Sequence, residues 1–126
     1  MKDRSFITLI GTLLLLLVLG GCEYTFIEPD TGDPVDPEVP ISFSQEVEPI
    51  WTTQNCVACH NGSSQFSLKP GEAYQSLMTK DLVNSDSPAD SDILTVPGTG
   101  LHNSKDYVGN QREVIRVWIE QGAQNN

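Results

Sequence analysis

The sequence predicts a small all-α domain of a few helices and long loops, covering residues 41–126. Apolar residues recur there at helical spacing, turn-forming residues separate these stretches, and no convincing alternating strand pattern occurs. The whole chain has 126 residues, which is enough for one small domain and too few for two full hydrophobic cores.

Residues 1–21 are typical of a signal peptide. Lys2 and Arg4 give a positive start, and the stretch 6–19 is almost wholly apolar. This stretch is shorter than the ~20 residues that a helix needs to cross a bilayer. Residues 19–22, Leu19-Gly20-Gly21-Cys22, resemble the lipobox of bacterial lipoproteins. An ordinary secretory signal or a short membrane anchor, with an incidental cysteine, is the alternative.

The lipobox resemblance implies that Cys22 becomes the acylated first residue of an exported protein. Several acyl chains on one residue give a stable anchor, where a single chain is marginal. The protein is therefore expected in the bacterial cell envelope, facing the periplasm or the cell surface. Residues 22–40 are expected to form the lipidated cysteine and an acidic tether.

Six acidic residues, four prolines and no basic residue occur in 23–40. Like charges repel and prolines favour extended backbone, so we expect a solvated spacer of up to roughly 55 Å. The net charge of the chain is -10. This charge argues against nucleic-acid binding, which needs a basic surface to displace counterions from phosphates.

The first helix of the domain is expected to begin at Ser44 as N-cap, with Val47, Ile50 and Trp51 forming an apolar stripe. Pro49 should bend this helix or mark a boundary within it.

A second helix is expected at about residues 71–78, with Tyr74, Leu77 and Met78 facing inward. A loop rich in Ser, Asp and Pro follows, and residues 92–95 are expected to form a single helical turn.

The last helix has the clearest signals. Asn110 as N-cap and Glu113 three residues later form a variant of the capping box, and Gly122 is placed to end the helix. Its apolar face consists of Val114, Ile115, Val117, Trp118 and Ile119.

Cys56-Val57-Ala58-Cys59-His60 matches the attachment signature of c-type haem. Two thiols three positions apart can form thioethers with the two vinyl groups of one porphyrin, and the adjacent His60 then binds the iron as proximal ligand. Such attachment needs an oxidising, non-cytoplasmic compartment, which the signal segment supplies independently. One haem would also enlarge the core of so small a domain.

Other uses of the two cysteines remain as alternatives. A thioredoxin-type dithiol would follow a strand in a βαβ unit, and no strand pattern precedes Cys56. A structural zinc site would usually need a second pair of ligands, and only His102 is left over. A plain disulfide would leave His60 unexplained.

The residues leave the second axial ligand of the iron open. His102 lies in a Gly-rich loop where a ligand could fold over the haem, although a solvent-exposed loop histidine is the alternative. Met78 is the second candidate, although methionine also serves as a core residue. An open site holding water is the third possibility.

The domain resembles the single-haem cytochrome c domains related to the planctomycete-type cytochrome C family. The features that carry the resemblance are Phe43, Val47-Glu48-Pro49-Ile50, the motif at 56–60, Leu68, Ser91-Asp92-Ile93-Leu94 and the terminal stretch 114–123. The resemblance covers roughly Phe43–Asn126. It implies a cytochrome c-like fold wrapped around one covalent haem c, with Trp118 and Ile119 packed against the porphyrin or the first helix.

In that family a methionine–proline pair commonly precedes the terminal tryptophan by about one helix and provides the distal ligand. Here the matching place holds Leu101-His102-Asn103. This departure favours coordination by His60 and His102, and therefore a relatively low reduction potential.

The function expected from these features is electron transfer by a membrane-anchored cytochrome, without catalysis. Its acid excess favours redox partners with a basic docking face. The alternatives are a haem enzyme or gas sensor with an open sixth site, and a non-redox binding lipoprotein with a structural metal.

Overall fold

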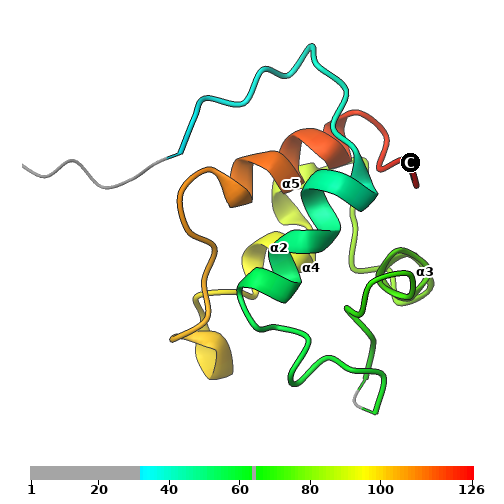
Figure 1. Cartoon of the computed structure of the whole chain (residues 1–126), viewed down its shortest axis with the longest axis vertical. Coiled ribbons are helices and arrows are strands. Elements are labelled where there is room, and N and C mark those ends of the chain that lie inside the picture. Colours follow the sequence, from blue (N-terminus) through cyan, green and yellow to red (C-terminus); the bar gives the residue numbers. More distant parts are fainter. Residues whose placement is uncertain (1–31, 64) are drawn as a thin grey trace, which may run out of the picture.

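The computed structural model describes residues 32–63 and 65–126, which fold into short helices joined by long loops (Figure 1). In chain order the helical segments are the π-helix η1 (Phe43–Val47), α2 (Glu48–Thr53), α3 (Ala73–Thr79), the 3₁₀ turn η2 (Pro88–Asp90), α4 (Asp92–Thr95), the 3₁₀ turn η3 (Gly100–His102) and α5 (Gln111–Glu120). Within the described ranges there is no strand, only an isolated bridge between Asn61 and Ser67. The predicted all-α class is confirmed.

The expected signal peptide and the lipidated Cys22 lie outside the described residues. Among the helices of residues 32–63 and 65–126, none has the length and apolarity that a membrane span requires.

The first helical segment begins two residues earlier than its sequence suggests. Ser42, not Ser44, is the N-cap, because its hydroxyl accepts a hydrogen bond from Gln45 N at 3.3 Å. The Ser44 hydroxyl instead donates to the backbone carbonyl of Asn126 at 2.8 Å. Pro49 lies in the first turn of α2, directly after the π-helix, so the predicted boundary at this proline is confirmed.

Helix α3 occupies nearly the expected place, and its inward face is narrower than expected. Leu77 is fully buried, and Tyr74 is half-buried with its hydroxyl donating to Ala123 O at 3.0 Å. Met78 is 39% exposed, so the prediction that it faces inward is wrong. The single turn α4 is confirmed at Asp92–Thr95.

Helix α5 forms where predicted, without the predicted capping box. The Asn110 side chain makes no cap and donates to Asp33 O at 2.6 Å, while Glu113 binds Arg116 on the same helix. Gly122 has a φ of 94°, a left-handed conformation that suits glycine and ends the helix.

Four aromatic side chains form the centre of the core. The Phe43 ring lies 5.1 Å from Trp118, 5.3 Å from Tyr74 and 5.9 Å from Trp51, measured between ring centroids. Segment η1 packs on α5, and α4 contacts α5 beside it. The fold is therefore a small helical cluster from which the long loops extend.

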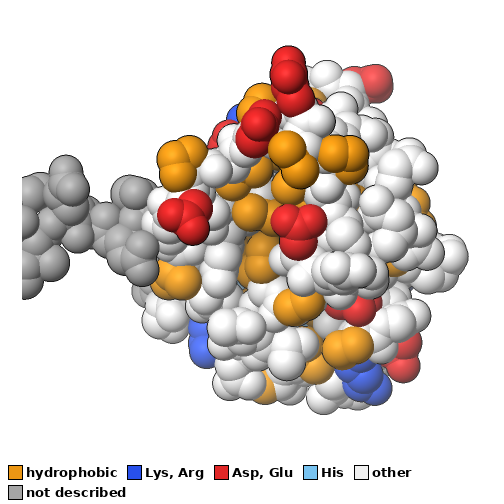
Figure 2. Space-filling model, turned by 45° about the horizontal axis from the view of Figure 1, so that its top comes forward, with side chains coloured by type: hydrophobic (Ala, Val, Ile, Leu, Met, Phe, Trp, Pro, Cys, Tyr) orange, Lys and Arg blue, Asp and Glu red, His pale blue; other side chains and the backbone are white. Residues whose placement is uncertain are grey.

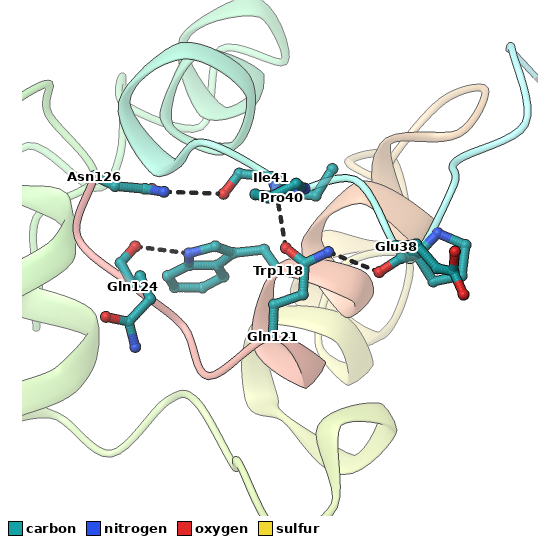
Figure 3. A pocket seen from close by; sticks show the side chains of 8 residues that line it. Glu38, Pro40, Ile41, Trp118, Gln121, Gln124 and Asn126 are labelled. Carbon is teal, nitrogen blue, oxygen red and sulfur yellow. Dashed lines mark hydrogen bonds between the residues drawn. The ribbon is translucent and has the colours of Figure 1, made fainter.

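The described end of the tether lies against the domain and does not stand free. Gln121 Nε2 donates to Pro37 O at 2.9 Å and to Val39 O at 2.8 Å, and its Oε1 accepts from Ile41 N at 2.8 Å (Figure 3). These contacts leave a cavity of about 260 Å³ between the tether and the end of α5, beside Trp118. Residues 33–40 remain exposed except for the half-buried Val35, as expected of a solvated tether, although carbonyls of Asp33, Pro37 and Val39 accept hydrogen bonds from Asn110 and Gln121 at the two ends of α5.

Candidate functional site

The Cys56–His60 motif lies in the loop that leaves α2. Asn55 has a φ of 57°, which turns the chain out of the helix, and Cys56 N donates to Trp51 O at 2.8 Å. His60 N donates to Cys56 O at 3.0 Å, and its own carbonyl accepts from Leu68 N at 2.8 Å. Both the N–H and the carbonyl of His60 are thus hydrogen-bonded, which fixes the position of its Cα.

The two thiols of this turn differ in exposure, because Cys56 packs against the hydrophobic core. Cys56 is half-buried, Cys59 is exposed, and no disulfide joins them. The exposed turn therefore leaves a thiol pair three residues apart, with a histidine next to the second thiol.

A distant loop brings His102 to His60. His102 ends η3, where its N–H donates to Thr99 O at 2.7 Å. Its ring centroid lies 5.9 Å from that of His60, and the two ring planes differ by 17°. The fold therefore brings these two imidazoles, far apart in the sequence, together as a near-parallel, stacked pair.

The surroundings of His60 are suited to a metal ligand. Burial, and then the charge of His102, lower the pKa of His60, which favours the neutral imidazole that binds metals. Its Nδ1 is buried, and no described residue makes a hydrogen bond to it. Such an atom costs about 1–3 kcal/mol unless a ligand or water binds at Nδ1 itself. The residue types present, two thiols and two imidazoles, are those that a c-type haem requires.

The same geometry argues against two of the other uses of the cysteines, the catalytic dithiol and the zinc site. Burial raises the pKa of Cys56 more than nearby Lys105 lowers it, and Cys56 follows the C-terminal end of α2. A catalytic dithiol needs the opposite, a lowered pKa, often at a helix N-terminus. Within residues 32–63 and 65–126, no three His, Cys, Asp or Glu side chains are grouped closely enough for a zinc site.

The remaining predicted site residues lie elsewhere. Met78 is exposed on α3, and Figure 1 places α3 and η3 on different sides of the domain. Trp118 and Ile119 are each 1% exposed, and Trp118 packs against Phe43 of η1. Trp118 was expected to pack against the porphyrin or the first helix, and in the structure it packs against the first helical segment.

Three residues near the motif carried no signal in the sequence. Phe66 stacks on His60 with 4.2 Å between ring centroids. The Tyr107 hydroxyl accepts from Trp51 Nε1 at 3.2 Å and donates to Ile93 O at 2.8 Å. Arg112 lies over the Tyr107 ring, 5.3 Å from its centroid. Only the folded loops reveal these neighbours, since none belongs to a motif.

Comparisons with family models, with curated proteins and with solved structures each found no match to this chain.

Proposed function

We propose that this chain is a membrane-tethered c-type cytochrome that carries single electrons. Cys56 and Cys59 would hold one haem c through thioethers, and His60 and His102 would bind its iron. The bound haem supplies a one-electron Fe(II)/Fe(III) couple. The observation that carries the proposal is the separation of 5.9 Å between the two near-parallel imidazoles.

The protein residues have separate tasks in this proposal. The two thiols would hold the cofactor covalently beside His60, whose backbone is already held by hydrogen bonds to Cys56 and Leu68. His102 would be the second iron ligand and would keep small external ligands from the metal. An imidazole in place of a methionine thioether also removes the ligand type that raises the potential. These roles suit electron transfer better than catalysis.

The finer fold and the location belong to the same proposal. The all-α domain would be cytochrome c-like, and acylated Cys22 would tether it in the bacterial cell envelope, facing the periplasm or the cell surface. Residues 41–126 carry 10 acidic and 5 basic side chains. On the face in Figure 2, acidic side chains lie among exposed hydrophobic ones. The acid excess of the domain favours a redox partner with a basic docking surface, whose association weakens as salt rises.

A pyridine-haemochrome assay with optical spectra of the oxidised and reduced protein tests the proposal. The full chain is expressed with haem-attachment machinery, and Cys56→Ala/Cys59→Ala is the control. We expect covalent haem in the wild type alone, with a low-spin spectrum in both redox states. A missing Soret band would overturn the proposal and favour a non-redox lipoprotein. A high-spin spectrum with rapid binding of carbon monoxide would favour an enzyme or a gas sensor.

A further inference from the structure

His102 lies in a loop, residues 98–106, whose two ends are joined by hydrogen bonds. We call this loop closed. Gly98 N donates to the carbonyl of Lys105 at 2.9 Å and to that of His102 at 3.1 Å. Gly98 has a φ of 84°, and a Cβ on it would lie 2.7 Å from the Asp106 carboxylate. The two ends of the segment 98–106 therefore meet at Gly98, whose left-handed backbone favours glycine.

One guanidinium from α5 binds both ends of this loop. Arg112 donates to Leu94 O and to Pro97 O (3.4 Å) on the side where the loop begins. On the side where the loop ends, it forms a salt bridge with Asp106 and lies over the Tyr107 ring. Guanidinium has five donors in a fixed fork, so it can bind several acceptors at once, which a lysine ammonium cannot do with the same geometry.

The same region links the loop to the cysteine motif. Tyr107 accepts a hydrogen bond from the Trp51 indole, and the Trp51 carbonyl accepts from Cys56 N. Asp106 and Tyr107 are adjacent, so the residue that ends the loop is also fixed to the helix that leads into Cys56. A force that holds Asp106 in place therefore also sets the distance between the loop and the motif.

We propose that Arg112 is a positioning residue that holds the His102 loop closed and so keeps the His102 imidazole opposite that of His60. The inference deepens the proposed function, on which the ligand role of His102 rests. Arg112 does not touch the cofactor site itself. It acts through Pro97 at one end of the loop and Asp106 at the other.

Arg112→Gln in the full chain tests this role, with Arg116→Gln as matched control. Arg116 lies on the same helix and pairs with Glu113 and Glu120, so its loss removes the same charge without touching the loop. Hydrogen exchange of the amides in 98–105 is measured first. Because these amides bond within the closed loop, we expect exchange about tenfold faster in Arg112→Gln than in Arg116→Gln. Equal exchange in the two variants overturns the inference.

The optical spectrum supplies the second readout. In haem-loaded Arg112→Gln we expect part of the iron to become high-spin and to return to low-spin when imidazole is added. Arg112→Lys should resemble Arg112→Gln, because the fork is lost although the charge remains. If Arg112→Gln does not fold, Asp106→Ala removes the partner of Arg112 at the end of the loop, and wild-type exchange in 98–105 of that variant overturns the inference.

The proposed function and the positioning role of Arg112 can each be refuted independently of the other. If the wild type carries no thioether-bound haem, the proposed function falls, whereas the exchange comparison still decides whether Arg112 closes the loop. If the wild type is low-spin and Arg112→Gln matches Arg116→Gln in spectrum and exchange, the cytochrome assignment stands and the role of Arg112 falls.

Discussion

The imidazole of His102 lies 5.9 Å from that of His60, with the two ring planes only 17° apart. The two side chains come from loops on either side of α3 and α4 in the chain, so their approach depends on the tertiary fold. Protonating both rings would place two like charges close together, and the pKa of His60 is lowered first by burial and then by this repulsion. A metal ion between neutral imidazoles would instead make their proximity favourable.

His102→Ala should therefore change the coordination of the haem and leave its attachment intact. We expect thioether-bound haem in normal amount, because Cys56 and Cys59 are untouched, together with a high-spin spectrum and rapid binding of carbon monoxide. Optical spectra and ligand-binding rates measure both effects. Met78→Leu is the control, and it should keep the wild-type spectrum. A methionine–iron charge-transfer band in the wild type, or a spectrum that His102→Ala leaves unchanged, would contradict the prediction.

The local elements of the fold could be predicted from sequence because their signals are local. Helix α5 and the single turn α4 follow from apolar spacing and from the residues that end them, and Pro49 marks the start of α2. The caps could not be predicted in the same way. Asn110 binds Asp33, and Ser44 binds the C-terminal backbone, so tertiary partners take the side chains that local rules assign to helix ends.

The residues of the candidate site divide in the same way, into those that a local pattern identifies and those that only the tertiary fold brings together. A motif of five consecutive residues suffices to single out Cys56, Cys59 and His60, because their chemistry depends on spacing alone. His102 could be named only as one candidate among three, and Arg112 could not be named at all. The contacts of Arg112 span Leu94 to Asp106, and only the closed loop brings them together.

Trp118 should contribute to stability and not to the haem spectrum. It is 1% exposed, packs against Phe43 and Tyr74, and donates its indole N–H to Gln124 O at 2.9 Å. Trp118→Ala is expected to lower the free energy of unfolding by about 3–5 kcal/mol, the usual cost of emptying a large core site. Urea unfolding followed by circular dichroism measures this loss. Trp118→Phe is the milder comparison for haem-loaded protein, and a shifted Soret maximum in that variant would indicate direct packing on the porphyrin.

Gln121→Ala should release the end of the tether. One carboxamide satisfies three backbone groups, at Pro37, Val39 and Ile41, so its removal is expected to cost about 1–2 kcal/mol. Limited proteolysis should then cut faster within 33–40. Gln124→Ala is the matched control, because among the described residues the Gln124 side chain bonds only to nearby Gly122 O, and the backbone carbonyl of residue 124 remains available to Trp118. Equal cleavage rates in the two variants would show that Gln121 does not hold the tether.

Alkaline pH should destabilise the fold through Tyr107. Burial, as the largest cause, raises the pKa of its phenol from 10.0 to about 12. Between these values the unfolded chain loses the phenolic proton while the folded chain retains it, so the unfolded state binds fewer protons and stability falls as pH rises. The loss attributable to this group is about 2–3 kcal/mol between pH 10 and pH 12.

Urea unfolding at several pH values, compared between wild type and Tyr107→Phe, isolates the contribution of Tyr107 from that of other groups that titrate in the range. Tyr107→Phe should be less stable than wild type at pH 8, by about 1–2 kcal/mol, because Trp51 Nε1 and Ile93 O lose their partner. Its stability should then fall less steeply above pH 10, and parallel pH profiles for the two proteins would refute the assignment.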